Sequence, residues 1–182
     1  MISAEFLLTS LIVVLMPGTG VIYTVATGLF RGKKAGLFAA LGCTLGILPS
    51  LIASITGLAI IFHTSALAFQ GVKLAGVAYL LYLAWSTLKS DNSLAFHEKP
   101  EQKSFSRIAL KGFLINILNP KLTIFFLAFL PQFIPHHAGH PAYHMLLPGI
   151  TLMVMTLGVF MLYGLLANRV RHDVIHSRWV TT

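Results

Sequence analysis

Charged side chains are scarce in this sequence. Asp, Glu, Lys and Arg together make up 10% of the 182 residues, whereas hydrophobic residues make up 56%. A soluble globular domain carries about 25% charged residues, because its surface must be covered with groups that water solvates. So few charges exclude an ordinary soluble domain, and we expect lipid to surround the outer surface.

Cysteines and acids are also few. Cys43 is the one cysteine, which excludes an intramolecular disulfide, and five acids leave a net charge of +8. The basic residues lie in short tracts between apolar runs, without the interleaved aromatic residues of a nucleic-acid surface, so we expect no nucleic-acid partner. No acid and no Ser/His/Asp set lies inside an apolar run, so we expect neither an enzyme nor a cofactor. We interpret His136, His137, His140 and His144 as a solvated loop rather than a metal site.

The apolar runs predict an all-α, polytopic membrane helix bundle that forms one transmembrane domain over residues 1–182. A spanning helix needs roughly 20 apolar residues to cross a hydrocarbon core of about 30 Å. Five runs meet this condition, at about residues 6–30, 35–62, 66–88, 106–133 and 143–167. The polar segment 89–105 is expected to be a linker, and the basic segment 168–182 a tail that does not cross the membrane.

The positions of the basic residues predict the orientation. In a five-span bundle, eleven of the thirteen lie on the same side of the membrane: Arg31, Lys33, Lys34, Lys89, Lys99, Lys103, Arg107, Lys111, Arg169, Arg171 and Arg178. Loops rich in Lys and Arg remain in the cytoplasm. We therefore expect the linker and the tail to be cytoplasmic and the N-terminus to be outside.

The first span contains Pro17, Gly18, Thr19 and Gly20 about halfway along. Proline removes a backbone donor and glycine permits unusual backbone conformations, so the helix is expected to break here. Within the membrane, a break is tolerated only against protein or a wet cavity. It is therefore either a packing kink or part of a substrate site, and we favour the site.

A second break is predicted in the fourth span, at Asn119, Pro120 and Lys121. Asn119 is suited to be an N-cap and Pro120 the first residue of a new helix. Lys121 lies deep in the span, where a charge is costly unless it is paired or reaches water. Three roles are open for Lys121: its side chain binds a partner group, caps carbonyl groups exposed at the break, or extends to the inner face of the membrane. Asn116, one turn earlier, is expected to line the same cavity.

The two breaks occupy corresponding positions in spans that run in opposite directions. This is the pattern of an inverted repeat, in which discontinuous helices meet at a midplane site. The N-terminus of a half-helix favours a carboxylate, and carbonyl groups at a C-terminus favour an ammonium group. A zwitterionic amino acid fits this pairing, and the geometry leaves other small polar solutes open as alternatives. The residues of the predicted site are Pro17, Gly18, Thr19, Gly20, Asn116, Asn119, Pro120 and Lys121.

Gly42 and Gly46 permit close helix packing, either within the subunit or in a homo-oligomer.

From residue 6 to about 168, the sequence resembles the lysine-exporter and homoserine/threonine-exporter family, LysE/RhtB. Beyond the two breaks, the resemblance includes Arg31-Gly32-Lys33, Gly36, Gly42, Gly46, Lys73-Leu74-Ala75-Gly76, Tyr79-Leu80, Gly112-Phe113, Phe125 and Pro131-Gln132-Phe133. It implies export of homoserine, threonine, lysine or similar compounds across a bacterial inner membrane, driven by the membrane potential or a proton gradient. It also implies two inverted halves of three helices each. The expected sixth span does not follow the basic tail, so the alternative is a truncated, transport-incompetent product or a helper subunit.

The orientation can be tested by labelling engineered cysteines in intact cells. Cysteines at Lys33 and Lys99 should be protected from an impermeant thiol reagent, whereas a cysteine at Gly139 should react. Labelling at position 33 but not at position 139 would reverse the orientation and the assignment of the repeat halves.

Overall fold

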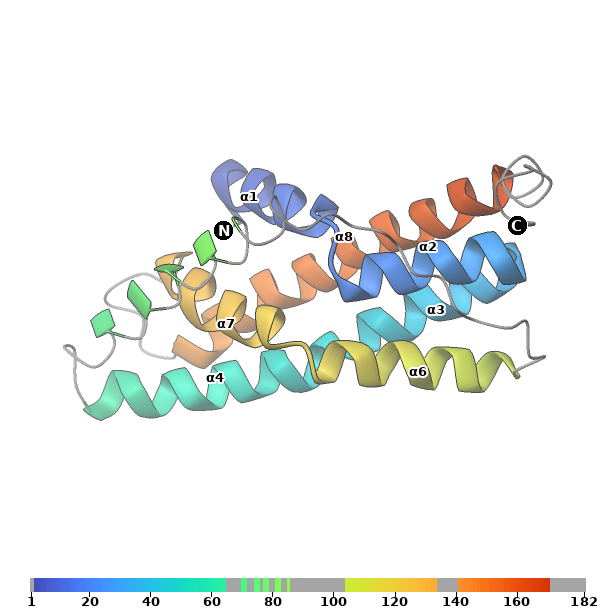
Figure 1. Ribbon diagram of the computed structural model, residues 1–182. Helices are drawn as coiled ribbons and strands as arrows, with labels where there is room; N and C mark the ends of the chain where they lie inside the picture. Colours follow the sequence, from blue (N-terminus) through green and yellow to red (C-terminus); the bar gives the residue numbers. More distant parts are fainter. Residues whose placement is uncertain are drawn as a thin grey trace.

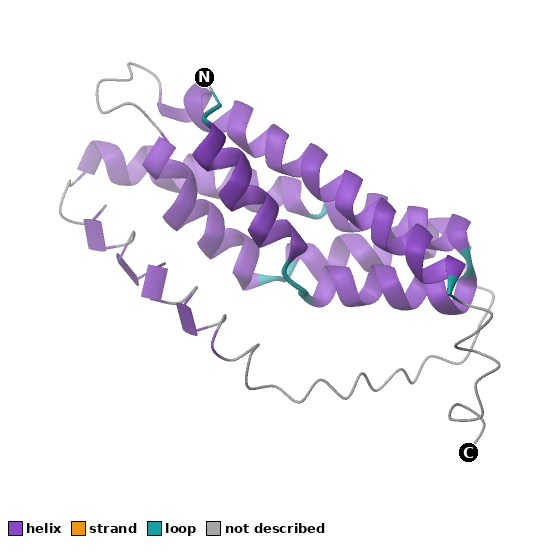
Figure 2. Cartoon of the chain, turned by 90° about the horizontal axis from the view of Figure 1, so that it is seen from above, coloured by secondary structure: helices purple, strands orange, loops and turns teal. Residues whose placement is uncertain are grey.

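The computed structural model describes residues 2–64, 104–133 and 141–170, together with single positions between 70 and 85. Every element in these ranges is a helix (Figure 2). They are α1 (Ala4–Leu15), α2 (Thr19–Arg31), α3 (Lys33–Leu45), α4 (Ile47–Thr64), α6 (Phe105–Ile117), α7 (Pro120–Phe129), the 3-10 helix η1 (Leu130–Phe133) and α8 (Pro141–Arg169). The prediction of an all-α membrane bundle agrees with this architecture.

The helices are arranged in two groups along the length of the molecule (Figure 1). α2, α3 and α6 pack together with the second half of α8 at one end, and α1, α4 and α7 pack with its first half at the other. Among the helices that the structure describes, only α8 runs through both groups without a break. The changes from α1 to α2, α3 to α4 and α6 to α7 therefore all fall near the middle of the molecule.

The break between α1 and α2 follows from proline chemistry. α1 begins at the N-cap Ser3, whose hydroxyl oxygen accepts from the Phe6 N–H at 3.1 Å, and its last bond runs from Met16 N–H to the Ile12 carbonyl. Pro17 has no N–H to continue the ladder. The chain resumes as α2 after Gly18, with a bend of 57° between the two helix axes. The predicted break in the first span is confirmed.

The second predicted break is also present. α6 ends with bonds from Leu118 N–H to the Leu114 carbonyl and from Asn119 N–H to the Asn116 carbonyl. α7 then begins at Pro120, whose missing N–H costs nothing at the first position of a helix. The assignment of Asn119 as the residue before the new helix and Pro120 as its first residue is confirmed.

Glycine residues on α3 bring it into backbone contact with α6. A methyl group on Gly42 would overlap the Ala109 carbonyl oxygen, and one on Gly46 would approach Asn116 Cβ to 2.9 Å. From the other side, a methyl group on Gly112 would lie 2.9 Å from the Ala39 carbonyl oxygen. The Gly42 and Gly46 motif therefore serves packing within the chain.

Aromatic side chains connect α1 to α7. Phe6 is buried and stacks on Phe129 at a centroid distance of 5.7 Å, while Phe125 stacks on Phe129 at 4.6 Å. Phe133 completes the cluster, with its ring edge-on to Phe6. These contacts hold the first half of span one against the second half of span four.

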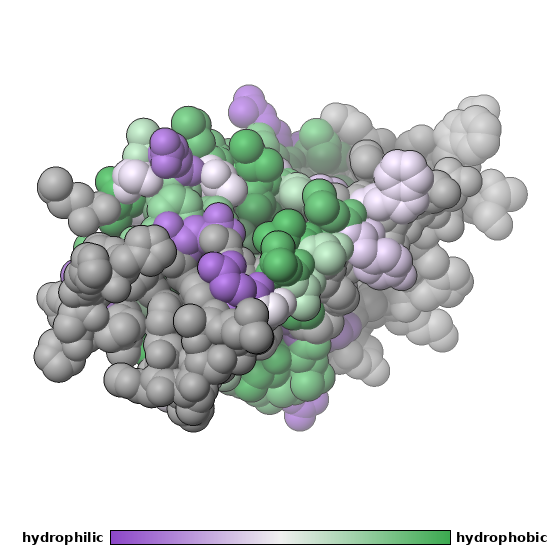
Figure 3. All heavy atoms as spheres, turned by 90° about the vertical axis from the view of Figure 1, so that its left-hand side faces the viewer, coloured by the Kyte–Doolittle hydropathy of each residue, from purple (hydrophilic) through white to green (hydrophobic). Residues whose placement is uncertain are grey.

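Large apolar side chains cover much of the outer surface. Leu8, Ile12 and Val154 are each more than 60% exposed, and apolar side chains also gather on the end of the molecule seen in Figure 3. By length and composition, two stretches of the described chain can cross a membrane, Lys33–Gly57 and His144–Arg169. The bent pair α1 and α2 makes a third if it forms one span.

The predicted spans can be compared with the helices where the chain is described. The second span is divided at Gly46 into α3 and α4, and α4 ends at Thr64 beside the expected turn. α6 to η1 cover the predicted fourth span, and α8 extends the fifth to Pro141–Arg169. Most of span 66–88, the linker and the tail lie outside the described residues, as do His136, His137 and His140. The five-span count therefore stays a prediction.

The α3–α6 contact predicts opposite effects for two glycine substitutions. Gly42→Ala forces a methyl group into the Ala109 carbonyl and should destabilise the fold by about 1–3 kcal/mol. Gly158→Ala is the matched control, because an added methyl group there meets nothing within 4 Å. Alanine is the better helix former by about 1 kcal/mol, so the control should be neutral or stabilising. Thermal unfolding of the purified variants in detergent measures both effects, and equal midpoints would contradict the contact.

Candidate functional site

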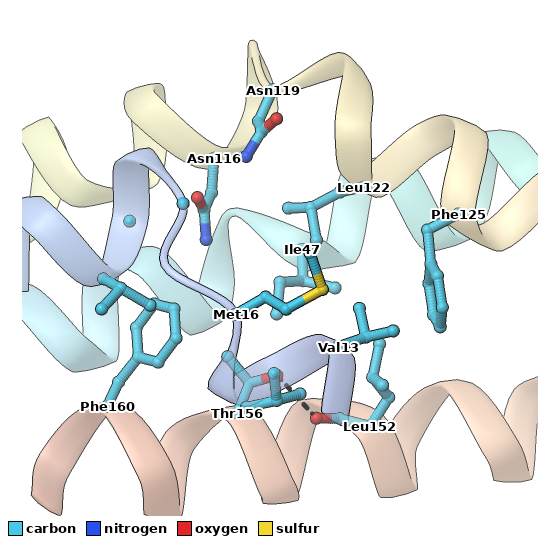
Figure 4. Close-up of a pocket in the computed structure, with 14 residues that line it drawn as sticks. Val13, Met16, Ile47, Asn116, Asn119, Leu122, Phe125, Leu152, Thr156 and Phe160 are labelled. Carbon is cyan, nitrogen blue, oxygen red and sulfur yellow. Dashed lines mark hydrogen bonds between the residues drawn. The ribbon is translucent and has the colours of Figure 1, made fainter. Parts of the chain in front are cut away.

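A cavity lies in the middle of the molecule, where the two helix breaks meet (Figure 4). It is a partly open cavity, and the empty space between its lining residues is about 510 Å³ when the open solvent at its mouth is included. Five segments line it: α1 with the residues that follow it, the first turn of α2, the start of α4, the α6–α7 break and the middle of α8. The lining residues are Val13, Val14, Met16, Gly18, Gly20, Val21, Ile47, Asn116, Asn119, Leu122, Phe125, Leu152, Thr156 and Phe160.

Asn116 is the most buried polar group of the cavity, with 3% of its surface exposed. Its Nδ2 donates to the Cys43 carbonyl oxygen at 2.7 Å. A methyl group built on Gly20 would lie 2.8 Å from Asn116 Oδ1, so this oxygen lies against the first turn of α2. The side chain therefore connects α3, α6 and α2 at one point.

A second polar contact joins the two breaks directly. Asn119 Nδ2 donates to Thr19 Oγ1 at 3.4 Å. Thr19 is exposed and lies outside the cavity, whereas Asn119 lines it. The residues predicted to belong to one site therefore do converge, although they lie about a hundred positions apart in the chain.

The first turn of α2 is the freest source of backbone donors in the site. The initial N–H groups of a helix have no partner within the helix, and Gly18 offers no side chain to cap them. The first bond of α2 runs from Ile22 N–H to the Gly18 carbonyl at 3.0 Å. At the other break, the Asn119 N–H is already bonded to Asn116, and the Leu122 N–H to Asn119. The start of α7 thus offers fewer open N–H groups than the start of α2.

The remaining walls of the cavity are apolar. Val13, Ile47, Leu122, Phe125 and Leu152 line the same space as the two asparagines (Figure 4). Thr156 is the one hydroxyl among the lining residues, and it is engaged by donating to the Leu152 carbonyl at 2.8 Å. None of the described residues that line the cavity carries a charge. The site is thus polar at one end and aliphatic or aromatic elsewhere.

The structure places some of the predicted site residues in the cavity and others beside it. Gly18, Gly20, Asn116 and Asn119 line the cavity. Pro17 and Thr19 are exposed beside it and shape the break. Pro120 and Lys121 belong to α7, but their side chains lie outside the described part of the structure, so the three roles considered for Lys121 stay open.

Sequence reasoning missed the walls supplied by α4 and α8. Leu152, Thr156 and Phe160 recur every four residues along α8 and so share one face of that helix. Their spacing was readable in the sequence, but every face of α8 is apolar. The one usable signal was Thr156, a hydroxyl in the middle of a predicted span.

Tyr163 satisfies a backbone group that the first break leaves open. Its hydroxyl donates to the Leu15 carbonyl oxygen at 3.1 Å. This carbonyl would bond to the fourth residue onward in an unbroken helix, but the chain turns at Pro17. α8 therefore stabilises the bend by supplying the missing donor.

Removal of this donor should destabilise the bend. Tyr163→Phe keeps the ring and leaves the Leu15 carbonyl without its partner, which should cost about 1 kcal/mol. The midpoint of thermal unfolding in detergent is the measurement, with the unmodified protein as the reference. A midpoint equal to that of the unmodified protein would mean that another donor serves Leu15.

Comparison with known proteins identifies relatives along almost the whole chain. Residues 11–181 match the family model described as LysE type translocator. The homoserine/homoserine lactone efflux protein of Salmonella typhimurium is 31% identical over 91% of this chain and 80% of its own length. The protein of the same name from Salmonella typhi is 30% identical over the same shares. An uncharacterized membrane protein of Vibrio cholerae is 30% identical over 87% of this chain and 76% of its own length. No solved structure matches significantly. The chain therefore belongs to the LysE type translocator family, and it is a multi-pass membrane transporter rather than an enzyme.

Proposed function

We propose that the protein exports amino acids or close derivatives, such as homoserine or threonine, across a bacterial inner membrane as a secondary transporter. The names of the two Salmonella relatives support the class of solute. The observation that carries the proposal is the central cavity, in which two broken helices bring a free helix N-terminus and the Asn116 amide to one end of an apolar space.

This arrangement is suited to a small zwitterion. The open N–H groups at the start of α2 and the positive end of its dipole favour a carboxylate. Broken helices at a midplane site are the usual way in which membrane transporters place such groups within lipid. The solute replaces some of its water by these donors, while its uncharged part contacts the apolar walls.

The position of the cavity suggests how access could alternate. It lies between the two helix groups, and the α1–α2 bend, the α3–α4 junction and the α6–α7 break all adjoin it. Bends at these points would move one group relative to the other and open the cavity to one side at a time. The resemblance to the LysE/RhtB exporters implies that the membrane potential or a proton gradient drives export.

The distribution of basic residues supports a cytoplasmic location for one end of the helix bundle. The end of α2, the start of α3, the start of α6 and the end of α8 lie at the same end of the bundle (Figure 1). These segments carry Arg31, Lys33, Lys34, Arg107, Lys111 and Arg169. By the positive-inside rule this end faces the cytoplasm, and the other end is the exit side.

Efflux of preloaded, labelled homoserine from cells tests the function. Cells that contain the unmodified chain should release it faster than cells without it. Gly20→Ala keeps every N–H group but places a methyl group at the polar end of the cavity, where it should block one hydrogen bond to the charged solute and lower efflux about ten- to a hundredfold at matched membrane levels. Its methyl group would lie 2.8 Å from Asn116 Oδ1 and 3.0 Å from Phe160 Cε2, at the polar end of the cavity.

Gly158→Ala controls for a general effect of adding a methyl group to a helix, since the space around Gly158 is open. It should export like the unmodified chain. If the unmodified chain reaches normal membrane levels and releases neither homoserine nor threonine, the export proposal is wrong and a helper role is favoured.

A further inference from the structure

The amide of Asn116 can be oriented from its partner. The Cys43 carbonyl can only accept a hydrogen bond, so the side-chain nitrogen of Asn116 must face it, at 2.7 Å. The oxygen Oδ1 is then turned toward the cavity and the first turn of α2. Figure 4 shows the side chain reaching from α6 into the space between the helices.

Asn116 Oδ1 lacks a donor within the described ranges. The one hydrogen bond of this side chain uses Nδ2, and the residue is 97% buried, since 3% of its surface is exposed. The residue is buried as a whole, but this oxygen is not fully enclosed, so it stays accessible to a hydrogen-bond donor. The oxygen borders the cavity, so a donor on a bound solute can reach it. Asn116 thus presents an acceptor, while the neighbouring start of α2 presents donors.

The walls limit the rest of the solute. Among the described lining residues there is no acid to pair with a second positive charge, and the apolar lining includes Ile47, Leu122 and Phe125. Placing an unpaired charge against such a surface is costly. An uncharged, short aliphatic side chain fits this surface, and a cationic one does not.

We propose that Asn116 Oδ1 accepts from the ammonium group of the solute, and that the cavity selects solutes with a free primary ammonium and an uncharged aliphatic side chain. This inference rests on the proposed export function for its biological meaning. It narrows the substrate class, because a second cationic group, as in lysine, is excluded. It also gives Asn116 a direct role in binding.

Direct binding to the purified full chain in detergent tests the selectivity without relying on transport. The probes are leucine, lysine and 4-methylpentanoate, which is leucine without its ammonium group. Isothermal titration should give leucine at least about tenfold tighter binding than 4-methylpentanoate, which lacks one charge-assisted hydrogen bond. Leucine should also bind at least about tenfold tighter than lysine, whose second ammonium group meets an apolar wall without an acid. Equal affinity for leucine and lysine, or no binding of any probe, would overturn the proposal.

A substitution separates the ammonium contact from a structural role. Asn116→Leu keeps the shape and removes the acceptor, so it should weaken leucine binding about ten- to a hundredfold. Binding of 4-methylpentanoate should change by less than about twofold. Equal weakening of both probes would mean that Asn116 merely supports the fold through Cys43. Gly158→Ala should leave both affinities unchanged.

The binding experiment can succeed or fail independently of the efflux experiment that tests export. Selective binding by a chain that releases no homoserine would contradict export and support this inference. Efflux by a chain that binds lysine as tightly as leucine would support export and contradict the selectivity.

Discussion

The close backbone contact between α3 and α6 is the constraint on which the rest of the structure depends. Within lipid, helices gain no hydrophobic free energy by associating, so van der Waals contact between backbones must hold them together. Gly42, Gly46 and Gly112 leave no room for a side chain at this interface. At this separation the Asn116 amide reaches the Cys43 carbonyl, and the orientation of that amide determines which atom faces the cavity. A wider spacing of the helices would remove both effects.

Two of the carbonyl groups released at the helix breaks have partners in the structure, one at each break. Tyr163 serves the Leu15 carbonyl, and the Asn116 carbonyl accepts from the Asn119 N–H. The first turn of α2 has no side-chain cap for its N–H groups, and this turn borders the cavity. An unsatisfied N–H group in the hydrocarbon region is costly. In a cavity that admits water or an anionic group, the same N–H groups are available for binding.

The polar and apolar parts of the cavity have separate roles in the proposed transport. In this proposal, the N–H donors of α2 and the Asn116 oxygen bind the carboxylate and ammonium groups that amino acids share. Ile47, Leu122 and Phe125 address the part that differs from one amino acid to another. Because the cavity lies between the two helix groups, a small change at the bends would alter access from either side. Binding and movement would thus involve the same segments.

The sequence by itself determined the membrane class, the two breaks and the family. Scarce charge excludes a water-facing surface, and Pro17 and Pro120 interrupt a helix by their covalent structure alone. Sequence reasoning also found Gly18, Gly20, Asn116 and Asn119, because polar and helix-breaking residues stand out in apolar spans. Only the tertiary structure decided that Asn116 bonds to Cys43, 73 positions away, and that Ile47, Leu152 and Phe160 form the walls. Lipid-facing and cavity-facing sides of these helices are equally apolar, so no periodicity in the sequence distinguishes them.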